Sequence, residues 1–317
     1  MELQKKNMKQ NTMIEKLLCS FNQNEIFVKR EDLLPFSFGG NKARKAKKFF
    51  DYIIKNNYEI VATYGSSSSN HCRVVANLAC KYGIECYIVS PEEEYKKTNN
   101  SKMVELFGAK VIKAPLDKIK ETIDQLMDEL TKNKKAYFIQ GGGHGNLGTE
   151  AYVEAYDEIL DYENENNLKF DYIFLASGTG TTQAGLVCGA ALNCENSEKI
   201  IGISIARKNP RGQAVIEESV RDYLESISYK GEVPNVIFDD SYICGGYGKY
   251  NDEIIGTIRE IISKEGMPLN TTYTGKAFWG MKEYLQKHKI VGKRVLFIHT
   301  GGTPLFFDDL KEIKWTF

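Results

Sequence analysis

The feature that most constrains the fold is a repeated alternation between short, continuously apolar runs and longer patterned segments. The clearest run is Tyr172-Ile173-Phe174-Leu175-Ala176, which is followed by a Gly/Thr-rich loop and a segment of small residues through Ala191. An apolar run that does not alternate with polar residues is typical of a strand buried on both faces. Repeated units of this kind predict an α/β protein in which helices cover both faces of parallel sheets.

The same reading, applied along the chain, predicts the order of the elements. Strands are expected at 25–29, 59–63, 86–89, 110–112, 136–140, 172–176, 200–205, 236–238 and 295–298. The polar N-terminal stretch 1–24, with Ile14, Leu17 and Leu18, is expected to be a surface helix. Helices are also expected after Lys42, up to Gly83, before Gly108, at 116–130, through Tyr152 and Ile159, up to Ala191 and from Tyr273.

Composition narrows the classes of function. The 317 residues allow one large domain or two unequal ones, and 42 basic residues balance 42 acidic ones. A net charge of zero gives no electrostatic footprint for nucleic acid or an anionic membrane. The sequence shows neither a long apolar run nor a signal peptide at its first residues, so we expect no membrane partner.

The cysteines point to a reducing compartment. There are seven, at scattered spacings and without a C-x-x-C pair, which favours free thiols in a cytoplasmic protein over disulfides or a zinc site. We expect Cys80, Cys188 and Cys194 in or near the core, and no bound metal.

Lys42 has an unusual setting among the many lysines. It follows Gly39-Gly40 and begins a helix whose apolar stripe is expected to include Ala46, Phe49, Phe50, Ile53 and Ile54. Arg44 and Lys45 are expected to be cationic neighbours of its amine. If the amine is also desolvated, its pKa falls and it becomes nucleophilic, as a Schiff base requires. Taken alone, the pattern is equally typical of a basic, solvated start of a helix.

Ser177–Gly185 is a candidate phosphate site between a buried strand and a helix. Glycines let backbone N–H groups converge, and Thr179, Thr181 and Thr182 add hydroxyl donors at the helix N-terminus. The loop lacks the Gly-Lys-Ser/Thr of a P-loop. Gln183 occupies the third glycine position of a dinucleotide motif, which argues against a nicotinamide cofactor.

Other loops add features to the same edge of the sheets. The serines at 66–69 with Asn70 could hold a second anion such as a carboxylate, and His71 is expected to be a surface histidine at a helix start. Tyr247 lies on a glycine hinge, either as a plain tight turn or flat against a planar cofactor. Tyr273 is either a core residue or a catalytic phenol, and Thr300 should point into the same crevice.

Four features together indicate pyridoxal 5'-phosphate. They are the reactive lysine, the phosphate loop, Tyr247 as an aromatic ring that could cover the cofactor, and the second anion loop. The absence of a G-x-S-x-G elbow argues against a serine hydrolase.

Six motifs, in this order, resemble the 1-aminocyclopropane-1-carboxylate deaminase/D-cysteine desulfhydrase family. They are Lys29-Arg30-Glu31-Asp32, Phe38-Gly39-Gly40-Asn41-Lys42-Ala43-Arg44-Lys45, Ser69-Asn70-His71, Thr179-Gly180-Thr181-Thr182-Gln183-Ala184-Gly185, Tyr273-Thr274-Gly275-Lys276 and His299-Thr300-Gly301-Gly302. The resemblance implies a tryptophan-synthase-β-like fold (fold type II) with two open, parallel-rich sheets. It also implies a large domain from 1–45 and 150–317, a small inserted domain at 46–149, and a homodimer.

The resemblance also implies roles for individual residues. Lys42 would form the Schiff base and Tyr273 would lie over the reacting carbon atoms, with Ser69 as a third catalytic residue. The cofactor would be held by Lys42, Asn70, Thr179, Gly180, Thr181, Thr182, Tyr247, Thr274 and Thr300. The small amino-acid substrate would contact Ser68, Ser69, Asn70, His71, Tyr247 and Tyr273.

Two positions divide the family by substrate. In the deaminases that this chain resembles, the pattern is Tyr-Glu-Gly at the positions of Tyr273-Thr274-Gly275, and leucine at the position of Thr300. Threonine at both positions is similar to the D-cysteine desulfhydrases and suits β-elimination of D-cysteine to pyruvate, sulfide and ammonia.

The chain also departs from the family pattern. Ser67-Ser68 replaces Ile-Gln, Ala43 replaces threonine, and 140–146 is richer in glycine. Three alternatives therefore stay open: cyclopropane ring opening, a lyase or racemase for another amino acid, and a non-catalytic sensor of a phosphate-bearing ligand.

Overall fold

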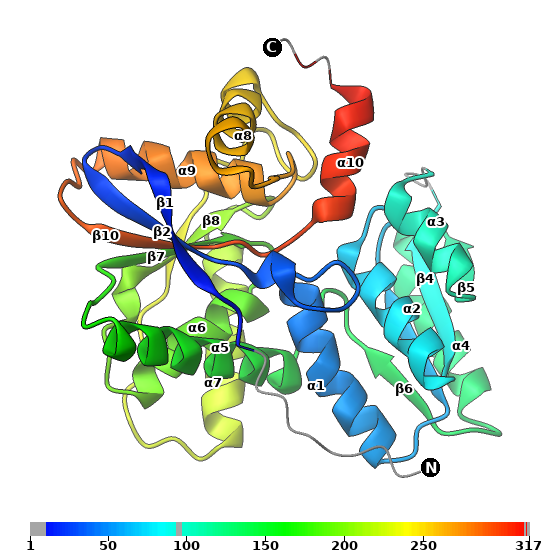
Figure 1. The fold of residues 1–317 in the computed structure, drawn as a ribbon. Coiled ribbons are helices and arrows are strands. Elements are labelled where there is room, and N and C mark those ends of the chain that lie inside the picture. Colours follow the sequence, from blue (N-terminus) through cyan, green and yellow to red (C-terminus); the bar gives the residue numbers. More distant parts are fainter. Residues whose placement is uncertain (1–10, 93–96, 314, 316–317) are drawn as a thin grey trace.

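Two sheets form the framework of the protein (Figure 1). The computed structural model describes residues 11–92, 97–313 and 315. A six-stranded sheet has the order β1-β2-β10-β7-β8-β9, and a four-stranded sheet has the order β5-β4-β3-β6. Every strand pair is parallel except the β1–β2 pair. The predicted α/β fold with two open, parallel-rich sheets is confirmed.

All of the strands except β1 lie close to their predicted positions. The larger sheet consists of β1 (Ile14–Phe21), β2 (Asn24–Lys29), β10 (Arg294–Ile298), β7 (Tyr172–Ser177), β8 (Ile200–Ser204) and β9 (Ile237–Asp239). The smaller sheet consists of β5 (Lys110–Ala114), β4 (Glu85–Pro91), β3 (Ile60–Tyr64) and β6 (Ala136–Ile139).

Helices cover both faces of each sheet. They are α1 (Asn41–Lys55), α2 (Asn70–Tyr82), α3 (Asn99–Leu106), α4 (Ile119–Leu130), α5 (Asn146–Glu165), α6 (Thr181–Leu192), α7 (Arg211–Ser226), α8 (Asp252–Glu265), α9 (Thr274–Lys287) and α10 (Thr303–Glu312). Short 3₁₀ turns occur at Glu31–Leu33, Leu116–Lys118 and Ser197–Lys199.

Burial on both faces explains the continuous apolar run of β7. Ile173 and Leu175 belong to the core shared with α5, α6 and α7. Phe174 and Ala176 point the other way, into the core shared with α8 and α9. Successive side chains of a strand alternate between faces, so a strand that is covered twice needs apolar residues at every position.

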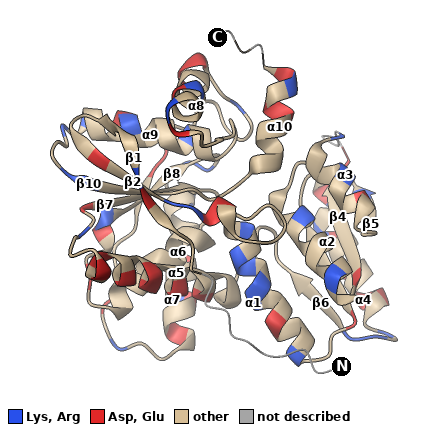
Figure 2. Ribbon diagram, viewed as in Figure 1, with Lys and Arg blue, Asp and Glu red and all other residues tan. Residues whose placement is uncertain are grey.

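Helix α1 connects the two sheets. Phe49, Phe50 and Ile53 pack into the core of the smaller sheet, while the helix also contacts α5 beside the larger sheet. Figure 2 shows basic residues along α1 and acidic residues along α5. This arrangement brings Lys48 to Glu150 and Glu154 across the contact.

We propose the division into domains that the sequence predicts, with 46–149 inserted between 1–45 and 150–317. All strands of the smaller sheet come from 60–139, and those of the larger sheet come from either side of this segment. Under this division α1 begins in the large domain and ends in the small one.

The prediction of a surface helix at the N-terminus is wrong for the residues that the structure describes, because Ile14–Phe21 is an edge strand. Leu17 is buried whereas Leu18 is 89% exposed, as the alternation of a strand requires. The turn at Asn22 and Gln23 has positive φ at both residues (51° and 59°), the conformation of a tight hairpin between twisted strands. Residues 1–10 of the predicted helix lie outside the described residues.

Three smaller expectations also need correction. Ile54 is 42% exposed and so does not belong to the buried stripe of α1, which ends at Ile53. Cys80 and Cys194 are exposed near helix C-termini, although Cys188 is buried as expected. The segment predicted as one helix at 116–130 begins with the 3₁₀ turn Leu116–Lys118.

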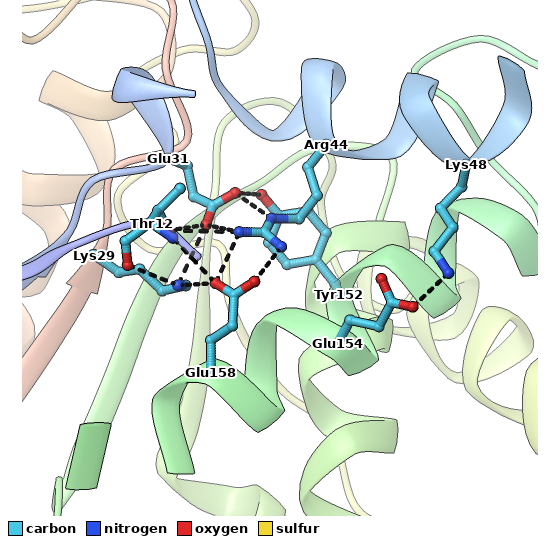
Figure 3. A network of polar contacts seen from close by, with 8 residues as sticks. All are labelled: Thr12, Lys29, Glu31, Arg44, Lys48, Tyr152, Glu154 and Glu158. Carbon is cyan, nitrogen blue, oxygen red and sulfur yellow. Dashed lines mark hydrogen bonds and ion pairs between the residues drawn. The ribbon is translucent and has the colours of Figure 1, made fainter. Parts of the chain in front are cut away.

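A buried cluster of charges joins β2, the Glu31–Leu33 turn, α1 and α5 (Figure 3). The Arg44 guanidinium donates to Glu31 over 2.6 and 2.8 Å and to Glu158 over 2.8 and 3.0 Å. The Tyr152 hydroxyl donates to Glu31 over 3.1 Å, and the Lys29 ammonium pairs with Glu158. Buried charges of this kind are tolerated only when each is paired, so the cluster defines the relative position of these elements.

We predict that Glu31→Ala lowers the free energy of unfolding by about 3–5 kcal/mol, because it removes one of the two carboxylates that the structure shows paired with the buried Arg44 charge. Glu121→Ala is the matched control, since Glu121 forms an exposed pair with Lys118, and it should change stability by less than about 1 kcal/mol. Urea denaturation followed by circular dichroism measures both. Equal effects of the two substitutions would contradict the prediction.

The cluster also predicts an acid-sensitive stability. Burial by itself raises the pKa of Glu31, but the charges of Arg44 and Lys29 outweigh it and lower the pKa from 4.5 to about 2. A carboxylate whose folded-state pKa is lowered stabilises the fold above its unfolded pKa, and this contribution is lost as the pH falls from about 4.5 to about 2. The stability of Glu31→Gln should therefore depend less on pH in that window than the wild-type stability does, as measured by thermal melting.

Candidate active site

A cavity of about 380 Å³ lies where strands of both sheets end. Its walls come from the segments that follow β3, β6, β7, β8 and β10, and three helices (α1, α2 and α6) begin beside it. The carboxyl ends of parallel strands are the usual ligand-binding edge of such sheets. Helix N-termini favour bound anions.

The Gly39-Gly40 turn delivers Lys42 to this cavity. Both glycines have positive φ (60° and 91°). A Cβ atom on Gly39 would lie 2.2 Å from the Asp32 carbonyl oxygen, and one on Gly40 would lie 2.7 Å from that of Thr300. The Asn41 N–H donates to the same Thr300 carbonyl over 3.0 Å. Only glycine allows the start of α1 to lie this close to the end of β10.

The surroundings of Lys42 make its amine more acidic than usual. Lys42 lines the cavity, and burial lowers its pKa from 10.5 to about 8. The expectation that Arg44 and Lys45 are both cationic neighbours is half right. Arg44 points away into the buried cluster, where Glu31 and Glu158 neutralise it. Lys45 does contact Lys42, but as a hydrogen-bond partner that by itself raises the pKa of Lys42, so burial alone causes the lowering.

Lys45 was expected only as a cationic neighbour of Lys42, and the sequence did not identify it as a binding residue. It is fully buried, and apart from a contact with the Lys42 amine its Nζ has no hydrogen-bond partner among the described residues. Burial and then the charge of Lys42 lower its pKa well below the usual value. An unpartnered buried amine close to another cation is costly unless an anion accompanies it. Its only signal in the sequence is the i, i+3 spacing from Lys42, which places both on one face of α1.

The loop after β7 provides further anion-binding groups. Gly178, Thr179, Gly180 and Thr182 line the cavity, and Asn41 donates to the Thr182 hydroxyl over 3.0 Å. Ser177 also lines the cavity, and its buried hydroxyl has no partner in the described part of the chain. The side chain of Thr181 does not line the cavity, because its hydroxyl lies 2.9 Å from His144 Nδ1.

These groups fit the phosphate of pyridoxal phosphate. The partnerless Ser177 hydroxyl, the N-terminus of α6 and the nearby Arg207 side chain all favour an anion at this end of the cavity. Lys45 does not line the cavity itself, but it adds a second amine next to Lys42. The site therefore has what the predicted cofactor needs: a lysine amine to bind its aldehyde and a cradle for its phosphate.

The serine loop forms the opposite wall. Ser66, Ser69 and Asn70 line the cavity, whereas Ser68 does not. The Ser69 hydroxyl accepts from the Cys72 N–H over 3.2 Å, so it caps α2 and keeps its own hydrogen for a ligand. The amide oxygen of Asn70 accepts from Asn100 over 3.0 Å, so its NH₂ group is the part available to the cavity. Ser66 was missed, because four serines in a row do not indicate which of them points inward.

His71 is buried and lines the cavity, so its interpretation as a surface histidine is wrong. The Thr63 hydroxyl donates its hydrogen to the Ile139 carbonyl over 2.7 Å, and His71 Nε2 lies 2.8 Å from the same hydroxyl oxygen. Nε2 must therefore carry a proton. Burial, and then the charges of Lys42 and Lys45, lower the pKa of His71 well below its usual value. The ring is neutral at pH 7, with Nδ1 as a hydrogen-bond acceptor.

Tyr247 and Tyr273 meet at the cavity. Their hydroxyl oxygens are 2.6 Å apart and their rings form an edge-to-face pair. Burial, and then Tyr247, raise the pKa of Tyr273 well above its usual value, so it is a phenol at neutral pH. Tyr247 is 43% exposed and lies on the solvent side of the pair.

Thr300 lines the cavity, whereas Thr274 is fully buried beside it. The Thr274 hydroxyl accepts from the Asn270 N–H over 3.0 Å and from its side-chain NH₂ over 3.1 Å. The same NH₂ group donates to the Gly301 carbonyl over 3.2 Å. Asn270, which the sequence reasoning missed, thereby connects the two threonine positions.

Other kinds of site find no support in the described residues. None of their His, Cys, Asp and Glu side chains gather in a group of three or more that could hold a metal ion. No helix in the described part of the chain has the length and apolar character of a membrane span.

Comparison with known proteins agrees with this geometry. The family described as "Pyridoxal-phosphate dependent enzyme" matches residues 10–301. A D-cysteine desulfhydrase from Serratia proteamaculans is 30% identical, with 93% of this chain and 92% of the relative covered. A Pyrococcus horikoshii protein provisionally named 1-aminocyclopropane-1-carboxylate deaminase is 31% identical, with 88% and 84% covered.

A solved structure extends the likeness to three dimensions. The crystal structure of a homologue of 1-aminocyclopropane-1-carboxylate deaminase superposes with a TM-score of 0.83 at 28% identity. The superposition covers 95% of this chain and 92% of that one. A threonine deaminase of known crystal structure shares the fold, with a TM-score of 0.63 at 17% identity over 88% of this chain and 87% of that one. The chain is thus a pyridoxal-phosphate-dependent enzyme and belongs to the 1-aminocyclopropane-1-carboxylate deaminase/D-cysteine desulfhydrase family.

Proposed function

We propose that this enzyme eliminates the β-substituent of a small D-amino acid, with D-cysteine as the best substrate. The observation that carries the proposal is the shared cavity wall of Lys42, the Tyr247–Tyr273 pair and Thr300. An amine, a pair of phenols and a hydroxyl thus surround one small volume, which supports their proposed roles as base, acid and neutral hydrogen-bonding group. D-cysteine and water would give pyruvate, hydrogen sulfide and ammonia.

The cofactor, once the substrate amine has displaced the Lys42 amine from it, would supply the electron sink that makes the Cα–H bond of the substrate acidic. Lys45, Ser177, the loop 178–182 and the N-terminus of α6 would hold its phosphate. The NH₂ group of Asn70 would donate to its phenolic oxygen. Tyr247 would lie against its ring, and Thr300 and Thr274 would lie near its pyridine nitrogen.

The substrate carboxylate would be held by the serine loop. The hydroxyls of Ser66 and Ser69 and the N-terminus of α2 are donors on one wall of the cavity. We retain Ser68 and His71 as substrate-binding residues in a supporting sense. Ser68 contacts Ser66, while its carbonyl accepts from Asn100. His71 presents an acceptor nitrogen to the cavity.

Two residues would move protons. With a pKa of about 8, the Lys42 amine has an appreciable neutral fraction at physiological pH and can take the Cα proton. Tyr273 retains its proton at neutral pH and can give it to the departing sulfur as the C–S bond breaks and the sulfur keeps the electron pair. Water then completes the release of ammonia and pyruvate.

The neutral character of Thr300 and Thr274 supports β-elimination over ring opening. A carboxylate at either position would keep the pyridine nitrogen protonated and deepen the electron sink, whereas a hydroxyl only hydrogen-bonds it. A weaker sink is sufficient when a good leaving group sits on the β-carbon. Cyclopropane ring opening is the alternative, since one relative carries that name. A cytoplasmic homodimer is also proposed.

A panel of amino acids tests the substrate assignment. Purified enzyme would be incubated with D-cysteine, L-cysteine, other D- and L-amino acids and 1-aminocyclopropane-1-carboxylate, and scored for keto acid and sulfide. We expect pyruvate and sulfide in equal amounts from D-cysteine, at a higher kcat/KM than for any other compound. Release of 2-oxobutanoate from the cyclopropane compound, without sulfide release from D-cysteine, would support the alternative.

We predict that Lys42→Ala abolishes both turnover and covalent attachment of the cofactor. Wild-type protein should absorb at roughly 410–420 nm and should be labelled by borohydride reduction. Lys47→Ala is the matched control, because Lys47 is on the same helix but pairs with Asp51 at the surface. A Lys42→Ala protein that kept the band and its activity would refute the role of Lys42.

We predict that Lys45→Met weakens cofactor binding by about 10-fold to 100-fold, because it removes a charge-assisted hydrogen bond to the phosphate. Spectral titration of cofactor-free protein with pyridoxal phosphate measures the dissociation constant. Lys48→Met serves as the control, since Lys48 is on the same helix but pairs with Glu154. Pyridoxal without phosphate should bind both variants equally, and a weaker binding of pyridoxal to Lys45→Met would argue against the phosphate contact.

We predict that Thr300→Val lowers kcat for D-cysteine by about tenfold, as expected for the loss of one hydrogen bond of about 1.4 kcal/mol. Thr300→Ser retains the hydroxyl and should retain most of the activity. Steady-state kinetics with the three proteins distinguishes the hydroxyl from the shape of the side chain. Equal losses in valine and serine variants would show that packing, not hydrogen bonding, is what matters.

A further inference from the structure

Lys276 is a buried lysine that the proposed reaction does not use. It lies in the first turn of α9 and is fully buried. Its ammonium donates to three backbone carbonyls: Gly246 over 2.7 Å, Ile243 over 2.9 Å and Ile205 over 3.4 Å. A buried ammonium held by main-chain carbonyls instead of a carboxylate is unusual, because buried charges normally pair with an opposite charge.

The three carbonyls belong to two segments that form the cavity. Ile243 and Gly246 are in the turn that carries Tyr247, and Ile205 begins the stretch 205–207 in the cavity wall. The turn has positive φ at Cys244, Gly245, Gly246 and Gly248 (49°, 80°, 123° and 69°). Three of these four residues are glycines, which adopt many other conformations as readily, so contacts from outside the turn are needed to hold it in this one.

Lys276 supplies that support as a positive charge. Burial lowers its pKa to about 8, so the ammonium form still predominates at pH 7, and the titratable neighbour that acts on it is the Cys244 thiol. Carbonyl oxygens that converge on a cation without a carboxylate are also the way in which proteins bind K⁺. An ammonium group on a side chain can take the place of such an ion.

We propose that Lys276 is a tethered cation whose contacts with Ile205, Ile243 and Gly246 position Tyr247 and the 205–207 wall around the cavity. It is a positioning residue, since its ammonium acts through the turn and not on the substrate. The consequence for turnover rests on the proposed role of Tyr247, whereas the consequence for the turn itself does not.

Two variants separate charge from packing. Lys276→Met keeps a long side chain without its charge, and Lys276→Ala leaves room in which a free cation can bind. Lys282→Met is the matched control on the same helix, because Lys282 pairs with Glu260 nearer the surface. Circular dichroism would first establish that each variant is folded.

Amide hydrogen exchange of the cofactor-free protein is the first readout. We expect the amides of 243–249 to exchange at least about tenfold faster in Lys276→Met and Lys276→Ala than in wild type and in Lys282→Met. With cofactor and substrate, kcat should fall by about 10-fold to 100-fold in both Lys276 variants, as is usual when a residue at the reacting centre is misplaced by about 1 Å.

Rescue by small cations is the second readout. KCl or NH₄Cl, but not choline chloride at the same ionic strength, should restore slow exchange at 243–249 in Lys276→Ala. Neither salt should help Lys276→Met, whose side chain fills the space. The proposal would be overturned if the amides of 243–249 exchanged as slowly in Lys276→Met as in wild type. It would also be overturned if neither KCl nor NH₄Cl slowed their exchange in Lys276→Ala. If the exchange results hold while no amino acid is turned over by the wild type, the tethered cation stands and the proposed function fails.

Discussion

The rest of the site depends on the close approach of the Gly39-Gly40 turn to the end of β10. There the backbone of Gly40 lies against Thr300 and Gly301, and the Asn41 N–H donates to the Thr300 carbonyl. This single contact brings the start of α1 to the edge of the larger sheet. It therefore places Lys42 beside Thr300, and through Asn41 and Thr182 it also sets the distance to the loop after β7. A side chain on Gly40 would separate these elements, because its Cβ would collide with the backbone of Thr300, and one on Gly39 would collide with the backbone of Asp32 in the preceding turn.

The buried charge cluster stabilises this contact from the opposite side of α1. Arg44 is two residues from Lys42 and points to the opposite side of α1, where Glu31 and Glu158 neutralise it. The helix thus presents a paired cation to the interior and the Lys42 amine to the site, with Lys45 in contact with Lys42. A chain with no net charge thereby keeps two amines that have no carboxylate partner among the described residues, at the place where a phosphate and a carboxylate are expected. The lowered pKa of His71, due to burial and then to Lys42 and Lys45, reflects the same electrostatic environment.

The wall formed by the smaller sheet is anchored through α3. Thr98 and Asn100 donate to the carbonyls of Ser67 and Ser68, so the beginning of α3 supports the serine loop. Asp308 of α10 in turn accepts from the Asn99 N–H. The substrate side of the cavity is therefore connected by hydrogen bonds to α10, the helix that follows β10. Both walls of the site are thus held by segments next to the same strand.

The sequence by itself determined the α/β class, the order of the strands from β2 to β10, and the loops that line the cavity, because continuous apolar runs and glycine-rich turns are local signals. It also singled out Lys42, Ser69, Asn70, Tyr247, Tyr273 and Thr300, all of which line the cavity. Only the tertiary structure decided that 14–21 is an edge strand, since its pairing with β2 outweighs a weak local pattern. Likewise, only the fold could show that Arg44 turns away from Lys42, that Ser66 and not Ser68 faces the cavity, and that Lys45 and Lys276 are buried. Which way a charged side chain points depends on partners distant in the sequence, and no local pattern encodes them.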